Sequence, residues 1–142
     1  MSKAAVIYWS MSGNTEAMAS AVAEGLKNAG AEVELKSVGQ ISAEDALGCD
    51  LLALGCPAMG AEVLEESEFE PFFSELEGKL GGRKVALFGS YGWGDGQWMR
   101  DWQDRVEAAG AELVGGEGVI ANYEPDDGAL EQCRQLGAAL AG

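Results

Sequence analysis

The chain of 142 residues is strongly acidic: 24 Asp and Glu stand against 9 Lys and Arg, which gives a formal net charge of −15 at pH 7. This charge makes nucleic-acid phosphates and anionic lipid surfaces poor partners, and it favours proteins with basic surfaces. The sequence contains no His, which excludes Ser-His-Asp and Cys-His catalysis and ordinary His-based metal sites, so we expect no bound metal.

Length and apolar content indicate one domain over residues 1–142 with a real core, since 47% of the residues are hydrophobic. No apolar run approaches the roughly 20 residues that span a bilayer. The N-terminal Met1-Ser2-Lys3 leads straight into a strand-like run rather than a secretory leader. The three Cys are odd in number and lack metal-type spacing, so reduced thiols are expected. We expect a cytoplasmic monomer.

Apolar, β-rich runs alternate with segments of helical period along the whole chain. The runs predict strands over residues 4–9, 32–37, 51–55, 84–89 and 112–121, the last interrupted by Gly115-Gly116. Apolar stripes predict helices over 18–29, 69–80, 99–109 and 130–140, and a short helical turn over 43–47 capped by Ser42. This alternation indicates an α/β fold: a single doubly wound domain with a five-stranded parallel sheet in the order 2-1-3-4-5 and helices on both faces.

The loop after the first predicted strand reads Ser10-Met11-Ser12-Gly13-Asn14-Thr15 and leads into the first helix. In a doubly wound sheet a ligand binds at the carboxyl ends of the strands, beside the switch point between strands 1 and 3. Hydroxyls, a glycine and the N–H groups of a helix N-terminus form an anion cradle without Lys or Arg, which suits a phosphate monoester. A Ser- and Thr-rich helix cap is the alternative interpretation.

Other phosphate-binding motifs are missing from the sequence. There is no G-x-x-x-x-G-K-[ST], and strand 1 is not followed by G-x-G-x-x-G, which disfavours ATP-type and NAD-type loops. A phospho-receiver would need acidic residues at the ends of strands 1 and 3, where Ser10 and Cys56 stand. A Cys-based phosphatase would need an Arg about six residues after Cys56, where Glu62 stands.

Two further loops meet the same edge of the predicted sheet. They read Cys56-Pro57-Ala58-Met59-Gly60-Ala61-Glu62 after strand 3 and Ser90-Tyr91-Gly92-Trp93-Gly94-Asp95-Gly96 after strand 4. Trp93 lies between glycines, where it cannot easily reach the core. We interpret it as a stacking wall for a flat ring, with Met59 on the opposite face; an ordinary surface aromatic is the alternative. A phosphate at one end and ring walls at the other describe a site for flavin mononucleotide (FMN).

These segments resemble the flavodoxin family. The loop at residues 10–15 matches the family's phosphate-binding pattern T/S-x-T/S-G-x-T. Residues 58–60 and 62–71 look like the clostridial type of short-chain flavodoxin, and the similarity continues through residues 89–96 and 122–126. It covers essentially the whole chain.

The resemblance implies a noncovalently bound FMN and a low-potential one-electron carrier, not an enzyme, that shuttles between semiquinone and hydroquinone in place of ferredoxin. The implied partners are basic-surfaced oxidoreductases and reductases that also use ferredoxin. The residues that would hold the phosphate, together with backbone N–H groups, are Ser10, Ser12, Asn14 and Thr15. Met59 and Trp93 would sandwich the isoalloxazine, Glu62 would accept the flavin N3–H, and Asn122 would lie near the ribityl chain and ring edge.

The full set of FMN-binding residues that the resemblance implies extends over all four loops. It comprises Ser10, Met11, Ser12, Gly13, Asn14, Thr15, Pro57, Ala58, Met59, Gly60, Ala61, Glu62, Ser90, Tyr91, Gly92, Trp93, Asp95, Asn122 and Glu124. Pro57 stands where clostridial members have Ser, and Tyr123 is an insertion into their Asn-Glu-Pro pattern.

Two features bear on the reduction potentials. In the family the Gly60-Ala61 peptide turns its carbonyl toward flavin N5–H when the semiquinone forms, and the unflipped turn needs a positive φ at Ala61, which costs about 1 kcal/mol. We therefore predict that Ala61→Gly lowers the oxidised/semiquinone potential. The second feature is a set of carboxylates, which would oppose a second negative charge on the flavin and steer basic partners. They belong to Glu62, Glu65, Glu66, Glu68, Glu70, Asp95, Glu124, Asp126 and Asp127. For any single one of these residues, the alternative interpretation is an ordinary position on a solvated acidic face.

Two other functions stay open on the sequence. An FMN-dependent two-electron quinone reductase could use the same fold, although the chain offers no spare loop for a second substrate pocket. A pure interaction module would have an empty cap loop, but it would leave Trp93 and Met59 unexplained.

Overall fold

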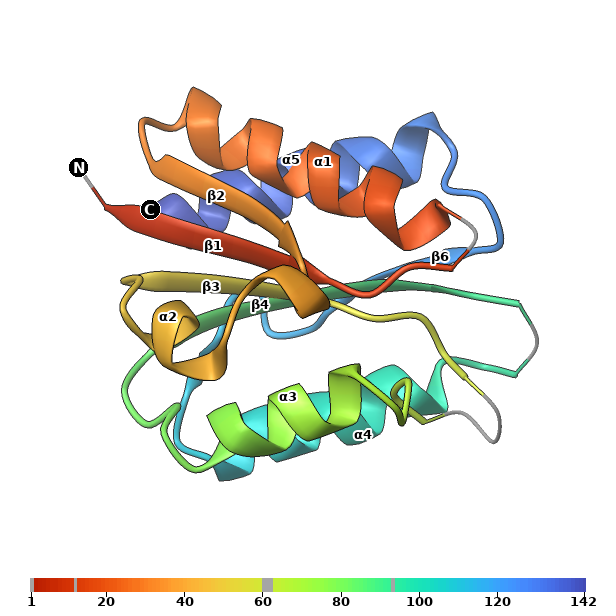
Figure 1. Ribbon diagram of the computed structural model, residues 1–142. Coiled ribbons are helices and arrows are strands. Elements are labelled where there is room, and N and C mark those ends of the chain that lie inside the picture. The colour runs from red at the N-terminus through yellow and green to blue at the C-terminus, as the bar shows by residue number, and fades with distance from the viewer. Residues whose placement is uncertain (1, 12, 60–62, 93) are drawn as a thin grey trace.

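The computed structural model describes residues 2–11, 13–59, 63–92 and 94–142. The strands are β1 (Lys3–Tyr8), β2 (Glu32–Ser37), β3 (Leu51–Gly55), β4 (Lys84–Tyr91), β5 (Glu112–Leu113) and β6 (Val119–Asn122). The helices are α1 (Asn14–Asn28), α2 (Ala43–Leu47), α3 (Phe69–Glu77), α4 (Gln97–Ala108) and α5 (Asp127–Ala141), and a 3-10 turn, η1 (Val38–Gln40), precedes α2. The sheet forms a middle layer, with α1 and α5 on one face and α3 and α4 on the other (Figure 1).

The sheet has the predicted order. Its strands run β2-β1-β3-β4-β5, each paired in parallel with its neighbours, and β6 also pairs with β4. The predicted fifth strand is thus two short strands: β5 lies against the first residues of β4, and β6 lies against its last four. Gly115 and Gly116 separate them, because both adopt left-handed backbone with φ of 81° and 78°, which interrupts a strand.

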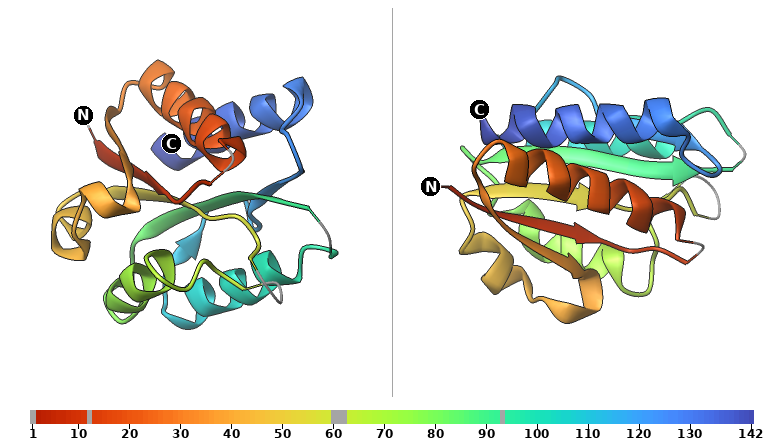
Figure 2. Two further views of the ribbon diagram at one scale, coloured as in Figure 1. Left: turned by 45° about the vertical axis from the view of Figure 1, so that its right-hand side comes forward. Right: turned by 90° about the horizontal axis from the view of Figure 1, so that it is seen from above.

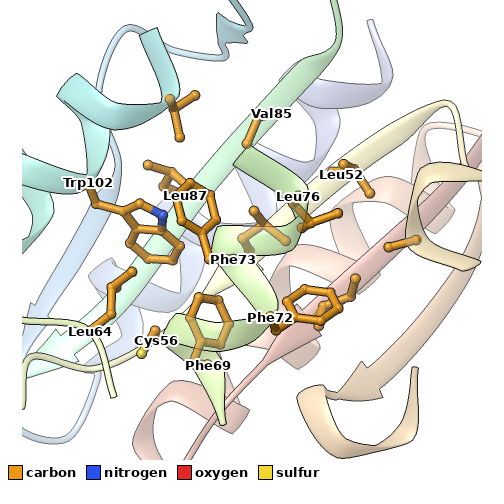
Figure 3. Packing of buried hydrophobic residues seen from close by; sticks show 14 of the residues in the cluster. Leu52, Cys56, Leu64, Phe69, Phe72, Phe73, Leu76, Val85, Leu87 and Trp102 are labelled. Atoms are coloured by element: carbon orange, nitrogen blue, oxygen red, sulfur yellow. The ribbon is translucent and has the colours of Figure 1, made fainter. Parts of the chain in front are cut away.

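The central strands are buried on both faces, as their continuous apolar runs predict. Alternate residues supply two separate cores. Val6 and Phe88 pack with α1 and α5, whereas Ile7 and Leu87 pack with α3 and α4. Figure 3 shows the second core, where Phe69, Phe72 and Phe73 of α3 lie between Leu52, Leu87 and Trp102. The ring of Trp102 meets those of Phe69 and Phe73 edge-on, at centroid distances of 5.4 and 5.8 Å.

Helices α1 and α5 run side by side over the sheet (Figures 1 and 2). Their contact is made close by two glycines. A methyl group at Gly25 would overlap the Arg134 carbonyl, and one at Gly137 would overlap the Val22 carbonyl. The absence of side chains at these two positions therefore allows the helix backbones to approach each other.

Several predicted boundaries move in the structure. Helix α3 ends at Glu77 rather than at Leu80, although Leu80 is fully buried. Strand β4 continues past residue 89 to Tyr91. Its last two residues, Ser90 and Tyr91, pair with Ala121 and Asn122 of β6. The predicted cap of α2 is confirmed, because Ser42 Oγ accepts a hydrogen bond from Asp45 N at 3.0 Å.

The three cysteines, Cys49, Cys56 and Cys133, are free and buried, as expected. Among the described residues, no helix is both long and apolar enough to cross a membrane.

Candidate functional site

The carboxyl ends of β1, β3 and β4 enclose a cleft of about 260 Å³. It lies at the switch point of the sheet, where β1 has β2 on one side and β3 on the other. The predicted FMN-binding residues that line it are Ser10, Met11, Asn14, Thr15, Pro57, Ala58, Met59, Ser90, Tyr91 and Gly92. The structure therefore brings three of the four predicted loops together in one place.

One end of the cleft is the N-terminus of α1. Gly13 is the residue before the helix and has a left-handed φ of 91°. Ser10 Oγ accepts hydrogen bonds from Gly13 N at 3.1 Å and from Glu16 N at 3.3 Å. In the part of the chain that the structure describes, the N–H groups of Asn14 and Thr15 have no acceptor. Helix N-terminal N–H groups without acceptors are suited to bind a phosphate, and the Ser10 hydroxyl keeps its proton for the same purpose.

Thr15 lines the cleft and also joins two elements. Its side chain is buried, and its Oγ1 lies 3.1 Å from Ser90 Oγ and accepts from Ser90 N at 3.4 Å. These bonds join the start of α1 to the end of β4. The Thr15 side chain thus links the start of α1 to β4 at the edge of the cleft that it lines.

The segment after β3 is held from two sides. Ala58 N donates to Ser90 O at 3.1 Å, which aligns it with β4. Met59 and Val63 form an antiparallel bridge, in which each N–H donates to the other's carbonyl at 2.9 Å. At the base of the segment, the buried Trp98 Nε1 donates to Cys56 O at 3.0 Å. The position of Met59 in the cleft is therefore set by main-chain bonds.

Glu65 anchors the far end of this segment rather than contributing to an exposed acidic surface. The side chain is only 6% exposed, and its carboxylate accepts from Glu68 N at 2.8 Å, Phe69 N at 2.9 Å, Ser67 N at 2.9 Å and the Ser67 hydroxyl. Burial alone would raise the pKa of Glu65, but these donors outweigh burial and hold the pKa below its ordinary value. Glu65 thus caps α3 as a buried carboxylate.

Cys56 lies under the same segment. Its Sγ accepts a hydrogen bond from Glu65 N at 3.3 Å, and burial raises the pKa of the thiol far above its ordinary value. A thiol that stays protonated is a poor nucleophile, so Cys56 acts as a packing residue.

The last wall of the cleft comes from the end of β6. Asn122 Nδ2 donates to Gly92 O at 3.0 Å and to Tyr91 O at 3.3 Å, which ties the loop after β4 to β6. Tyr123 N donates to Tyr91 O at 2.6 Å, and its ring lies against Gly92, where an added Cβ would come within 3.1 Å of Tyr123 Cε1. Tyr123 and Trp9 both line the cleft, although neither was among the predicted residues.

The remaining predicted residues lie elsewhere or outside the described chain. Asp95 pairs with Arg100 at 3.0 Å and does not line the cleft. Asn122 and Glu124 line a neighbouring hollow of about 370 Å³. The residues outside the described chain are Ser12, Gly60, Ala61, Glu62 and Trp93.

The predicted acidic cluster is only partly free. Glu70 forms a bidentate pair with Arg105 at 2.7 and 2.8 Å, and Arg105 also binds Glu77. Glu68 Oε1 accepts from Trp9 Nε1 at 3.2 Å. Arg105 carries one positive charge against the two carboxylates of Glu70 and Glu77, so the three groups together keep one negative charge. Glu70 thus contributes less free charge than the sequence alone indicates, whereas the hydrogen bond from Trp9 leaves the charge of Glu68 in place.

The geometry fits FMN. The α1 N-terminus offers N–H groups and a hydroxyl to a phosphate monoester, and the apolar side chains of Met59, Tyr91 and Tyr123 lie in the same cleft. A doubly wound α/β fold with this cleft at its switch point defines a protein of the flavodoxin-like class.

Comparison with known proteins names the family. The flavodoxin family model matches residues 6–137. The chain is 48% identical to a flavodoxin of Clostridium beijerinckii and to one of Megasphaera elsdenii, over 96% of this chain and 97% and 96% of those proteins. The solution structure of two-electron-reduced Megasphaera elsdenii flavodoxin superposes with a TM-score of 0.88, at 47% identity, over 97% of this chain and 98% of that one.

The chain therefore belongs to the flavodoxin family, whose members bind FMN and carry electrons. The alternative of a two-electron quinone reductase finds no support in these comparisons.

Proposed function

We propose that this flavodoxin is a low-potential one-electron carrier that works in place of ferredoxin, cycling between the one-electron- and two-electron-reduced states of its FMN. It is a cytoplasmic monomer, and it is a carrier rather than an enzyme. Its partners are ferredoxin-using oxidoreductases and reductases with basic surfaces, and neither nucleic acid nor a membrane is a partner. The observation that carries this proposal is the charge around the cleft.

Carboxylates flank the cleft on two sides. Glu16 and Glu68 line a hollow that shares Trp9 and Ser10 with the cleft. Glu124 and Asp126 line the hollow on the other side. None of the described residues that line the cleft or these two hollows is Lys or Arg. The ligand is thus surrounded by negative charge, without a basic side chain to offset it.

This charge opposes the addition of a second electron. At about 10 Å, with an effective dielectric between roughly 20 and 80, each carboxylate raises the energy of a second negative charge by about 0.4 to 1.7 kcal/mol before salt screening. Several carboxylates together lower the potential of the second reduction step substantially. A carrier that works in place of ferredoxin needs such a low potential. The same charges attract basic surfaces and raise the rate of encounter with them.

We propose that the residues implied by the family pattern bind FMN. Thr15 also ties the loop to β4 through Ser90, and Asp95 also pairs with Arg100. Ser10 and the first N–H groups of α1 hold the phosphate, and Met59 contacts the ring. Bound FMN supplies the electron-transfer chemistry, and the protein supplies the binding contacts and the surrounding charge.

A reductive titration of the purified, FMN-supplemented protein, followed by visible absorbance, tests the proposal. We expect a yellow protein that turns blue after one electron and bleaches after the second, with the second step at the lower potential. Direct bleaching would contradict the one-electron carrier and support two-electron chemistry. Steady oxidation of NAD(P)H by the purified protein alone would contradict the assignment as a non-enzyme, and failure to take up FMN would overturn the site.

A further inference from the structure

Tyr123 has the most unusual backbone of the described residues. It is the only non-glycine residue among them with a positive φ, at 58°. A bulky aromatic side chain rarely adopts left-handed backbone, because its Cβ crowds the neighbouring carbonyl, and Gly or Asn would adopt it at less cost. Strained residues of this kind cluster at ligand sites, where other interactions hold them in place.

Two hydrogen bonds to main-chain carbonyls hold the backbone at Tyr123 in this conformation. Tyr123 N donates to Tyr91 O at 2.6 Å, and the preceding Asn122 side chain donates to Gly92 O at 3.0 Å. Both bonds reach the end of β4, which also lines the cleft. The backbone of Tyr123 is therefore fixed in relation to the cleft.

The side chain of Tyr123 makes few stabilising contacts with the rest of the described chain. It is 63% exposed, and in the described chain its hydroxyl has no hydrogen-bond partner and its ring has no aromatic partner. One edge of the ring lies close to Gly92, where an added Cβ would come within 3.1 Å of Tyr123 Cε1. Tyr123 lines the cleft together with Met59 and Tyr91.

We infer that Tyr123 is a wall of the FMN cleft that contacts the ring system of the bound cofactor, so that ligand contact offsets its backbone strain. The inference rests on the proposed FMN cleft and adds a residue that the family pattern does not contain. An aromatic ring held at the cleft edge buries flat apolar surface of a flavin at little cost in side-chain freedom. Tyr123 is therefore a specificity-determining residue for the flavin ring, not for the phosphate.

The test compares Tyr123→Asn, which suits left-handed backbone but lacks the ring, with Tyr123→Phe, which keeps the ring. The dissociation constants of FMN and of riboflavin, which lacks the phosphate, are measured by quenching of flavin fluorescence. We expect Tyr123→Asn to weaken both ligands about tenfold, which corresponds to about 1.4 kcal/mol, and Tyr123→Phe to stay within about twofold of the wild type. The melting temperature of the flavin-free Asn variant should be unchanged or raised by about 2 to 4 °C, because strain is relieved.

A structural role would lower the stability of the flavin-free protein and flavin affinity together. Three results would overturn the inference: FMN affinity within twofold of wild type in Tyr123→Asn, a lower melting temperature of its flavin-free form, or weaker FMN binding with unchanged riboflavin binding. If the wild-type protein itself fails to bind FMN, the proposed function falls, and the inference falls with it.

Discussion

Replacing the buried carboxylate of Glu65 should destabilise the protein strongly. Glu65→Gln keeps the shape of the side chain but turns one accepting oxygen into an NH₂ group. In the structure each carboxylate oxygen accepts two donors: Oε1 accepts from Glu68 N and Phe69 N, and Oε2 accepts from the N–H and hydroxyl of Ser67. The least costly orientation turns the NH₂ group toward Ser67, whose hydroxyl can then accept, so one main-chain N–H loses its acceptor and the other donors lose a charged one.

The lost bond costs about 1.5 kcal/mol and the missing charge at the remaining bonds about as much again, so the variant should lose about 3 kcal/mol of unfolding free energy at pH 7. Urea unfolding of the flavin-free protein, followed by circular dichroism, measures this loss. With a slope of about 2 kcal/mol per molar urea, the midpoint should fall by roughly 1.5 M. The matched control is Glu66→Gln, because Glu66 is the adjacent residue but is exposed. The control should stay within about 0.5 kcal/mol of the wild type.

The pH dependence gives an independent check. Because the pKa of Glu65 is lower in the folded protein than its ordinary 4.5, the charged carboxylate contributes its full stabilisation above about pH 4.5. That contribution is lost as the pH falls through the lower folded-state pKa. The difference in stability between wild type and Glu65→Gln should therefore shrink on acidification. A loss below 0.5 kcal/mol at pH 7, or a difference that stays constant into acid, would refute the role of this carboxylate.

Other predictions concern packing, phosphate binding and partner encounter. Gly137→Ala should lower the unfolding free energy by about 2 kcal/mol or more, because its methyl group would overlap the Val22 carbonyl. Gly78→Ala, with no atom within 4 Å of the added Cβ, should be neutral or stabilising by up to about 1 kcal/mol; equal losses in the two variants would contradict the close contact of α1 with α5. Ser10→Ala should weaken FMN at least about fivefold and leave riboflavin unchanged, as fluorescence titration would show, whereas equal losses for both ligands would place Ser10 away from the phosphate. The rate of electron transfer to a basic redox protein should fall steeply as salt rises from 0.05 to about 0.5 M, and a rate independent of salt would argue against electrostatic steering.

Much of the site follows from residues that are neighbours in the chain. Ser10 and Gly13 belong to one short loop, so their hydrogen bond and the N-terminus of α1 are local properties. For the same reason the cap at Ser42 was predictable from sequence alone. By contrast, Glu65 was predicted as one member of an acidic stretch, because sequence shows the charge of a residue but not its burial.

The sequence by itself determined the order of strands and helices, the switch-point cleft and the phosphate loop. These features depend on the period of apolar residues and on contacts between residues that are close in the chain. Both are set by the order of the residues, before the tertiary structure forms. The tertiary structure alone decided that Thr15 binds Ser90 across 75 residues, that Arg105 pairs with Glu70, and that Tyr123 borders the cleft. These contacts join residues from different elements, so they exist only once the sheet is assembled and each side chain has a fixed position.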